Sequence, residues 1–257
     1  MSEVIELFST KIKERIVSDV DPDGGVSVVT TGKRYKGVIF DLDGTLLNTL
    51  DDIADTMNAL LKGARFPQHP VDAFKQFVGD GADTMVRRSL PPDEVTDQLV
   101  KKMYKKFRKR YKNNWKKKTV PYDGIIPLFD TLQQAGLFLA ILSNKPHNET
   151  ADAVSWFFGS HRFTVCLGYG VFPRKPDPEA VEYILSTLGI RADECLYVGD
   201  TGTDMKTAAA AGVDAIGVSW GFREPKELLS NGAKWIVLHP NEILPLALNN
   251  SKVSTNT

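Results

Sequence analysis

Cysteine is nearly absent from this chain, which has only Cys166 and Cys195 among 257 residues. Their separation does not match the paired spacing of cysteine metal ligands. Nothing near the N-terminus resembles a secretory signal, so oxidative crosslinking outside the cell is not indicated either. These absences predict a cytoplasmic protein that keeps its two thiols reduced.

Long apolar runs and an excess of one charge are missing too. No run approaches the roughly 18 apolar residues that a membrane span needs, and Glu3 and Glu6 interrupt the only early apolar stretch. The 32 Lys and Arg residues balance 32 Asp and Glu residues, so net charge indicates no polyanionic partner. We therefore expect a soluble protein with no membrane and no nucleic acid partner.

Short, β-branched apolar runs recur along the chain and predict buried strands. They begin at Gly37, Leu137, Phe163, Cys195 and Ala215. Helical patterns lie between most of them, at 127–134, 148–158, 178–188 and 204–211. This alternation predicts an α/β fold, a parallel sheet with helices on both faces. Gly136, Gly189 and Gly212 stand where three of the helices should end.

Residues 51–122 break this alternation, because they show helical periodicity and no convincing strand. We interpret them as an all-helical insert that divides one core into residues 35–50 and 123–250. Residues 1–34 are then an N-terminal segment, either a flexible extension or an added strand. Residues 251–257 are a tail.

Two aspartates one residue apart close the first apolar run, "GVIFDLDGTLLNT". Asp41 is a plausible nucleophile toward phosphorus, because an aspartyl phosphate divides one hard hydrolysis into two easier steps. Asp43 would reach the same crevice, where it could protonate a leaving oxygen and then activate water. Gly44 permits a tight turn, and Thr45 can hydrogen-bond the loop. The alternative is an ordinary strand-end turn with a helix cap.

Three later segments carry polar side chains at or beyond other predicted strands. In "LAILSNKP", Ser143 and Asn144 could hold phosphoryl oxygens, and in "FPRKPDP" Lys175 could neutralise phosphate charge. In "LYVGDTGTD", Asp200 ends a strand and Asp204 follows one helical turn later, and such oxygen ligands suit Mg²⁺. Each segment has an alternative: common loop residues, a solvated lysine, or a carboxylate that stabilises a helix start.

In this order, the four segments resemble those of phosphatases in the haloacid dehalogenase-like superfamily, over roughly residues 36–240. The resemblance implies a Rossmann-like core in which Asp41 is the nucleophile and Asp43 the general acid and base. It implies that Ser143 and Lys175 contact the phosphate. Dehalogenases of the superfamily lack an acidic residue at the place of Asp43, which argues against carbon–halogen hydrolysis.

The same resemblance implies a bound Mg²⁺ ion. Its ligands would be Asp41, the backbone carbonyl of Asp43 and Asp200, with Asp204 supporting the site directly or through water. The other residues of these segments expected beside the substrate are Gly44, Thr45 and Asn144.

The helical insert looks like the cap of this superfamily, which closes over small substrates and excludes bulk water. Within it, "FVGDGADTMVRRSL" resembles the loop and helix of phosphoglycolate phosphatase-like members. That implies that Gly79, Asp80, Gly81 and either Arg87 or Arg88 face the substrate. The alternative is a helix capped by Asp80, with both arginines in water.

The resemblance therefore implies hydrolysis of a small phosphorylated metabolite, in the manner of phosphoglycolate phosphatase. Pyrophosphatases and nucleotidases of the superfamily share the pattern and stay open as alternatives.

A different function is suggested by residues 101–118, which include eleven basic residues and no acidic one. Tyr104, Phe107, Tyr111 and Trp115 fall nearly four apart, so a helix would present one aromatic stripe beside basic flanks. A nucleic-acid or anionic-membrane binding module has these features. The simpler interpretation is the packing face of a cap helix, with the lysines in solvent.

Overall fold

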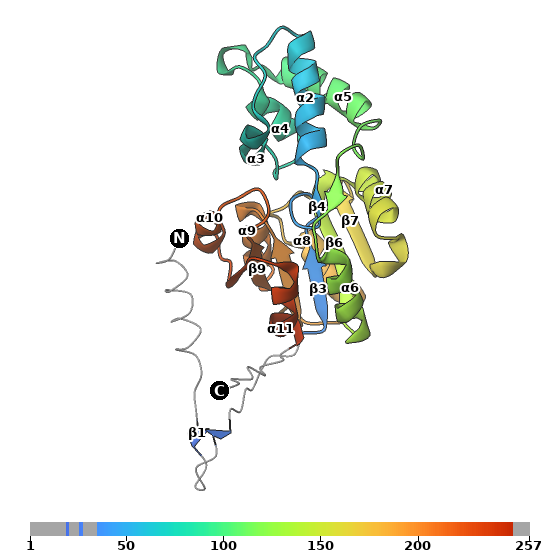
Figure 1. Ribbon diagram of the computed structural model, residues 1–257, viewed down its shortest axis with the longest axis vertical. Helices are drawn as coiled ribbons and strands as arrows, with labels where there is room; N and C mark the ends of the chain where they lie inside the picture. The colour runs from blue at the N-terminus through green and yellow to red at the C-terminus, as the bar shows by residue number, and fades with distance from the viewer. Residues whose placement is uncertain (1–18, 21–25, 28–34, 249–257) are drawn as a thin grey trace. The chain divides into compact units, whose positions relative to one another are not determined.

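The computed structural model describes residues 19–20, 26–27 and 35–248, and a six-stranded sheet lies at the centre of the last range (Figure 1). The strands are β3 (Gly37–Phe40), β6 (Phe138–Pro146), β7 (Val165–Tyr169), β8 (Cys195–Gly199), β9 (Asp214–Val218) and β10 (Trp235–Val237). Their order is β10-β9-β8-β3-β6-β7, and every neighbouring pair is parallel. The predicted parallel sheet is confirmed. The three-residue edge strand β10 is too short for the pattern to have revealed it.

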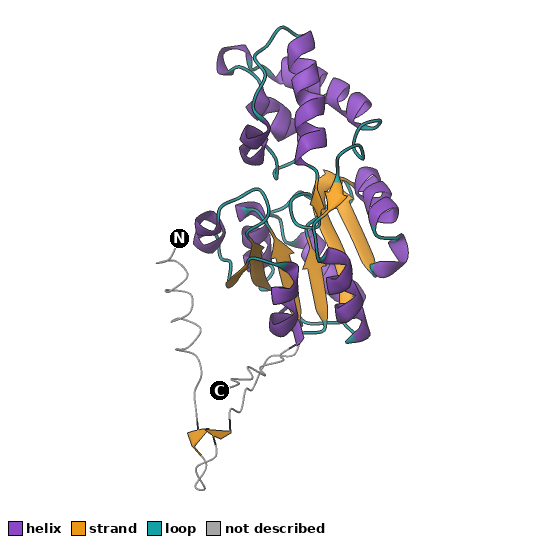
Figure 2. Ribbon diagram, in the orientation of Figure 1, coloured by secondary structure: helices purple, strands orange, loops and turns teal. Residues whose placement is uncertain are grey.

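Side chains alternate along the strands, so both faces of the sheet are buried. In β3, Val38 and Phe40 belong to one apolar cluster and Ile39 to the other. Helices cover both faces (Figure 2). One face carries α6 (Ile125–Gln134), α7 (His147–Phe157) and α11 (Ile243–Leu248), and the other carries α8 (Glu179–Leu188), α9 (Gly202–Ala210) and α10 (Pro225–Ser230). Burial on both sides explains why the strands are continuous apolar runs.

The predicted helix ends agree with the structure to within a few residues. Gly136, Gly189 and Gly212 follow α6, α8 and α9 closely. Gly189 is the C-cap residue of α8 and adopts φ 65°, a left-handed conformation that strains any residue with a Cβ.

A helical insert leaves and rejoins the core between two short strands, β4 (Leu47–Asn48) and β5 (Val120–Pro121), which pair antiparallel. Its helices are α2 (Leu50–Gly63), α3 (Phe74–Phe77), α4 (Ala82–Ser89) and α5 (Asp97–Tyr111), with 3₁₀ turns at Val71–Ala73 and Pro92–Glu94. We call α2 to α5 the cap. The all-helical insert was predicted, but the short strand β5 at its end was not. β5 has two residues, one of them proline, which is too little for a strand pattern.

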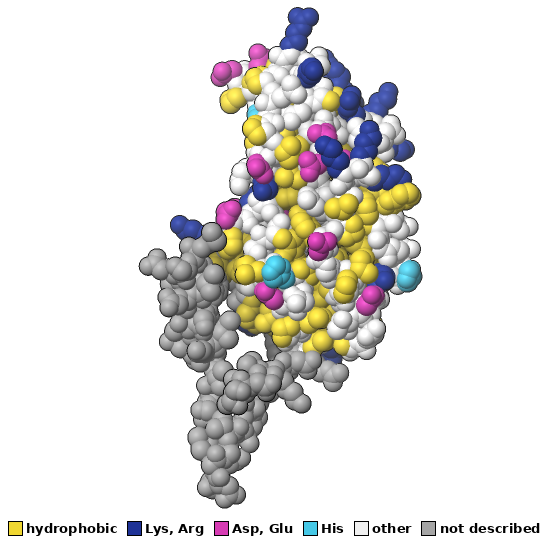
Figure 3. Space-filling view, in the orientation of Figure 1, with side chains coloured by type: hydrophobic (Ala, Val, Ile, Leu, Met, Phe, Trp, Pro, Cys, Tyr) yellow, Lys and Arg dark blue, Asp and Glu magenta, His cyan; other side chains and the backbone are white. Residues whose placement is uncertain are grey.

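The cap has an apolar cluster, to which α2, α3, α4 and α5 all contribute and which also includes Phe222 of the core. The aromatic stripe of α5 packs there: Phe107 and Tyr111 are buried, and Tyr104 and Trp115 lie against the same cluster. The eleven basic side chains of residues 101–118 are exposed, and Figure 3 shows Lys and Arg side chains gathered over the cap. The packing interpretation of the stripe is confirmed.

The predictions for residues 1–34 and 251–257 fall outside the described residues, apart from β1 (Asp19–Val20) and β2 (Val26–Ser27). These two strands pair antiparallel with each other, in a unit distinct from residues 34–250. Neither cysteine forms a disulfide. Across the described ranges, every helix is too short or too polar to cross a bilayer.

Asp52 of α2 stabilises, through hydrogen bonds, the segment that leads from the cap back to β5. Its buried carboxylate accepts hydrogen bonds from the backbone N–H groups of Lys117, Lys118 and Thr119, at 2.9 to 3.1 Å. The hydroxyl of Thr119 donates a further bond at 2.8 Å. One ionised side chain therefore satisfies several amides where the cap joins the core.

We expect Asp52→Ala to lower the free energy of unfolding by about 2–4 kcal/mol, because buried amides would lose their acceptor. Urea unfolding followed by circular dichroism measures the change. Asp55→Ala is the matched control, since Asp55 lies on the same helix and its ion pair with Lys118 joins two half-exposed side chains. Asp55→Ala should have little effect, and equal losses in the two variants would contradict this account of Asp52.

Candidate active site

The carboxyl ends of three strands meet at one edge of the sheet, because β3 lies between β8 and β6. Asp41 follows β3, Asp200 follows β8, and Ser143 lies near the end of β6. Lys175 reaches this edge from the loop between β7 and α8. Residues far apart in the sequence therefore meet where parallel sheets commonly bind ligands.

Asp41, Asp200 and Asp204 form a buried acidic cluster, in which one carboxylate oxygen from each lies within 4.8 Å of the others. The ammonium of Lys175 contacts two of these residues, with Nζ 2.8 Å from Asp41 Oδ1 and 2.7 Å from Asp204 Oδ1. Nζ also donates to the carbonyl of Leu142 at 3.2 Å. The three protons of this ammonium thus each have an acceptor, which fixes its position.

The cluster concentrates negative charge away from water. Burial raises the pKa of Asp41 to about 7, although Lys175 opposes that shift. Burial also raises the pKa of Asp200 well above its usual range, and the charges of Asp204 and Asp41 add to the effect. Burial opposes the charge of Lys175, yet the carboxylates of Asp204 and Asp41 raise its pKa well above the ordinary value. If all three carboxylates are ionised, they exceed the one ammonium by two negative charges.

These residues fit a divalent cation such as Mg²⁺, whose charge matches that excess and which prefers oxygen ligands. The Asp200 carboxylate is held in one orientation, since Oδ1 accepts from the hydroxyl of Thr45 at 2.9 Å and Oδ2 from the N–H of Phe222 at 2.8 Å. Gly44 leaves space beside it. This glycine adopts φ 91°, and a Cβ there would lie 2.3 Å from Asp200 Oδ2.

Asp204 also caps a helix. Its Oδ2 accepts from the N–H of Thr201 at 3.0 Å and from the Thr201 hydroxyl at 2.6 Å, forming the capping box of α9. Its Oδ1 faces Lys175. Asp204 therefore both stabilises the start of α9 and belongs to the acidic cluster.

Asp43 lies nearer the cap and has a lysine of its own. Nζ of Lys145 is 2.8 and 3.0 Å from the two carboxylate oxygens, and the Lys145 side chain is 7 % exposed. Lys145 lies in β6, two residues after Ser143. The sequence analysis quoted "LSNKP" but did not predict a role for its lysine. A single lysine in a sequence does not indicate which carboxylate it will contact.

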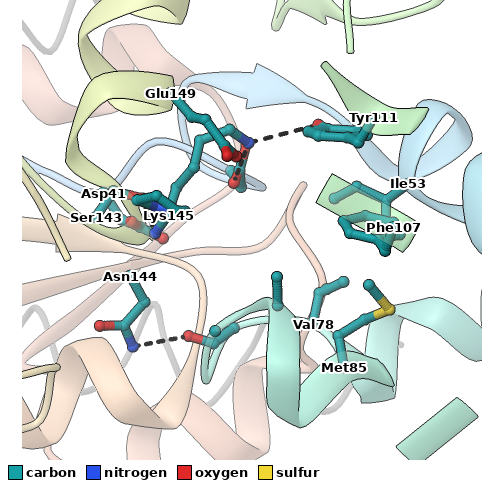
Figure 4. Close-up of a pocket in the computed structure, with 15 residues that line it drawn as sticks. Asp41, Ile53, Val78, Met85, Phe107, Tyr111, Ser143, Asn144, Lys145 and Glu149 are labelled. Atoms are coloured by element: carbon teal, nitrogen blue, oxygen red, sulfur yellow. Dashed lines mark hydrogen bonds and ion pairs between the residues drawn. The ribbon is translucent and has the colours of Figure 1, made fainter. Parts of the chain in front are cut away.

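Core and cap together line a cleft of about 60 Å³ above Asp41 and Asp43 (Figure 4). Ser143, Asn144, Lys145 and Glu149 contribute from the core. The cap contributes mostly apolar groups: Ile53, Val78, Met85, Phe107 and Tyr111. A cleft of this size accommodates a small group.

Asn144 and Ser143, both predicted to hold phosphoryl oxygens, form hydrogen bonds with neighbouring protein groups. Asn144 lines the cleft, but its Oδ1 accepts from the N–H of Lys175 at 3.0 Å and its Nδ2 donates to the carbonyl of Gly79 at 3.0 Å. It thus joins the Lys175 loop to the cap. Ser143 lines the cleft, and its hydroxyl accepts from the N–H of Lys145 at 3.2 Å. Gly44 and Thr45 are absent from the cleft lining and instead surround Asp200.

The predicted cap loop is only partly at the cleft. Gly79 and Gly81 line it. Asp80, between them, accepts from the Thr203 hydroxyl of α9 at 2.6 Å and pairs with Arg88 at 2.6 Å. The alternative that Asp80 caps the helix is wrong, because Gly81 is the N-cap residue of α4.

The prediction that Arg87 faces the substrate needs correction. Its side chain is 48 % exposed and pairs with Asp97 at the surface of the cap. Met85 of the same helix lines the cleft. Two residues turn a helix by about 200°, so Arg87 points to the opposite side.

The chain is similar to known proteins over most of its length. Residues 38–218 match the family described as haloacid dehalogenase-like hydrolase. The phosphoglycolate phosphatase of Mannheimia succiniciproducens is 29 % identical over 210 residues, which are 79 % of this chain and 94 % of that protein. The phosphoglycolate phosphatase of Pseudomonas savastanoi pv. phaseolicola is 28 % identical over 226 residues, 86 % of this chain and 83 % of that protein.

The chain is also similar to solved structures described as phosphoglycolate phosphatases. A candidate phosphoglycolate phosphatase from Lactobacillus delbrueckii subsp. bulgaricus superimposes with a TM-score of 0.79 at 30 % identity, covering 84 % of this chain and 99 % of that one. A predicted phosphoglycolate phosphatase from Haemophilus somnus gives 0.76 at 28 % identity, covering 82 % and 97 %.

If the acidic cluster binds Mg²⁺, the ion should stabilise the fold, by about 1.4 kcal/mol at ten times its dissociation constant. We expect MgCl₂ to raise the melting temperature above that in NaCl of equal ionic strength, measured by scanning fluorimetry. Asp200→Asn should lose most of this rise, because it removes a charged ligand. Asp130→Asn, at an exposed ion pair on α6, is the control and should keep it. Equal rises in wild type and Asp200→Asn would contradict the assignment.

Proposed function

The chain belongs to the haloacid dehalogenase-like hydrolases, and on this basis we propose that it hydrolyses small phosphomonoesters through a phosphorylated Asp41. The observation that carries the proposal is the convergence of Asp41, Lys175 and Asp200 at one strand edge, with Asp43 two residues from the nucleophile. This is the arrangement that phosphoryl transfer to a carboxylate needs.

Lys175 supports the nucleophile in two ways. Its ammonium, 2.8 Å from Asp41 Oδ1, fixes the direction of the carboxylate. The same charge lessens repulsion between that carboxylate and an anionic phosphate. By exchanging one of its present acceptors for a phosphoryl oxygen, the ammonium would bind phosphate together with the hydroxyl of Ser143. Asn144 holds the Lys175 loop in place through the N–H of Lys175.

Asp41, the backbone carbonyl of Asp43 and Asp200 would hold Mg²⁺, with Asp204 in support, and the ion would supply positive charge to the phosphoryl oxygens. Asp41 attacks phosphorus while the bond from phosphorus to the leaving oxygen breaks, and Asp43 gives that oxygen a proton. Asp43, now ionised, takes a proton from water as the water oxygen attacks phosphorus. The bond from phosphorus to Asp41 then breaks, which releases phosphate and restores both side chains.

The substrate class follows from the cleft and the relatives. The cleft above Asp41 and Asp43 is small, about 60 Å³, which favours a short leaving group. Relatives that match most of this chain are named phosphoglycolate phosphatase. We therefore propose a short phosphomonoester such as phosphoglycolate as substrate. Phe107 and Tyr111 of α5 are buried in the cap, so these two rings are not available to stack on nucleic-acid bases.

Purified protein should release phosphate from p-nitrophenyl phosphate and from a panel of short phosphomonoesters, and EDTA should abolish the release. Asp41→Asn should lower kcat by at least about 10³-fold, because the amide cannot attack phosphorus. Asp130→Asn should leave kcat unchanged, and circular dichroism should show that both variants are folded. Substantial turnover by Asp41→Asn with Mg²⁺ present would exclude the aspartyl phosphate.

A further inference from the structure

Two lysine–aspartate pairs lie in the cleft, and the proposed function uses only one of the lysines. Lys175 pairs with Asp41, the nucleophile. Lys145 pairs with Asp43, the proposed acid and base, and the proposed reaction gives Lys145 no task. Its burial at the cleft makes it more than a surface lysine, because an ammonium loses hydration there and needs specific partners.

Lys145 is fixed from both sides of the cleft. It lies near the end of β6, and the paired part of this strand, residues 138–141, is hydrogen-bonded to β3, the strand that precedes Asp43. Nζ contacts both oxygens of Asp43 at 2.8 and 3.0 Å, and lies 3.4 Å from the hydroxyl of Tyr111 on the cap. Figure 4 shows Lys145 with a dashed line to Tyr111 across the cleft. The Tyr111 ring is itself stacked on Phe107, which limits its movement.

The Asp43 carboxylate depends on this ammonium for its direction. The backbone around Asp43 is held by the turn to Leu47, in which the N–H of Gly44 donates to the Leu47 carbonyl at 2.8 Å. Across residues 35–248, the hydrogen-bond contacts of the carboxylate itself are those with Lys145. A general acid must lie within hydrogen-bond reach of the oxygen that it protonates, so a freely rotating Asp43 would be a poor one.

We propose that Lys145 is a positioning residue, which directs the Asp43 carboxylate toward the leaving oxygen and, through Tyr111, ties that direction to the placement of the cap. The inference rests on the proposed function, since it assumes that Asp43 transfers the proton. Nζ lies almost equally far from both oxygens of Asp43. A small rotation therefore keeps one contact and turns the other oxygen, which carries the proton in the first step, to the leaving group. No atom of Lys145 is transferred in either step.

The test compares leaving groups that differ in their need for a proton. An alkoxide must be protonated as it leaves, whereas p-nitrophenolate leaves without protonation. Activation of water by Asp43 in the second step is common to all substrates, so the substrates are compared by kcat/KM, which reports the steps up to departure of the leaving group. Poor placement of the acid should lower kcat/KM for alkyl esters only. The probes are p-nitrophenyl phosphate, glycerol 1-phosphate and phosphoglycolate. Lys145→Met keeps the length of the side chain and removes the ammonium.

For Lys145→Met we expect kcat/KM to fall roughly 10²-fold with both alkyl phosphates and less than about fivefold with p-nitrophenyl phosphate. KM should change little for all three substrates. Lys145→Arg should recover part of the lost alkyl phosphate activity. Tyr111→Phe, which keeps the ring and its stacking, should show the same selective loss at about threefold, and gives a second readout if Lys145→Met folds poorly.

Two controls bound the interpretation. Lys234→Met breaks another lysine–aspartate pair, with Asp214 at 3.0 Å, at the opposite edge of the sheet, just before β10, and should change no rate. Asp43→Asn should show the same selectivity as Lys145→Met with a larger loss. Circular dichroism melting curves compare the folding of all variants.

Three outcomes would overturn the inference. Equal losses on all three substrates, while Asp43→Asn is selective, would show that Lys145 is merely structural. A rise in KM confined to phosphoglycolate would show that Lys145 binds the substrate carboxylate instead. In both of these cases the proposed function would stand, because wild type would still cleave the esters with Mg²⁺. A wild-type protein inactive on all three probes would overturn the proposed function and this inference together.

Discussion

The site depends on an electrostatic imbalance that the fold maintains. Asp41, Asp200 and Asp204 are buried, with one carboxylate oxygen from each within 4.8 Å of the others, and the Lys175 ammonium offsets only part of their charge. Such a cluster is costly unless a cation joins it. The surrounding structure keeps the carboxylates together despite this cost. Neighbouring strands fix the backbone positions of the aspartates, and hydrogen bonds from Thr45 and Phe222 hold Asp200 in place. Stability is given up locally where chemistry requires charge.

The cap meets the core through both apolar and polar contacts. Phe222 of the core belongs to the apolar cluster of the cap, and Trp115 packs against the core cluster as well. The polar contacts include Arg108 with Glu149, Arg174 with Asp83, Thr203 with Asp80, and Arg223 with the carbonyl of Val78. Together they place apolar cap side chains such as Ile53 and Met85 over the cleft.

Much of the fold was predictable, because β3, β6, β8 and β9 are buried on both faces and so appear as apolar runs. The convergence of Asp41 and Asp200 was predictable for a related reason, since residues that follow parallel strands share one edge. The edge strand β10 and the short β5 were not, because their pairing is set by neighbours and not by their own residues. Arg87 was placed wrongly because a motif does not specify the rotation of a helix.

Lys145 shows most clearly where sequence reasoning ends. Its partners come from two segments, Asp43 at the first strand and Tyr111 at the end of α5, and its type and position predict neither contact. The basic run around Tyr111 directed attention to a surface role, yet the aromatic face of that helix supplies the cap core and one hydroxyl at the cleft. The aromatic face of α5 therefore has two roles. Its packing in the cap holds Tyr111 in place, and through Tyr111 the position of Lys145 depends on the placement of the cap. A charged exposed face is compatible with this arrangement, because the lysines on that side are exposed to solvent.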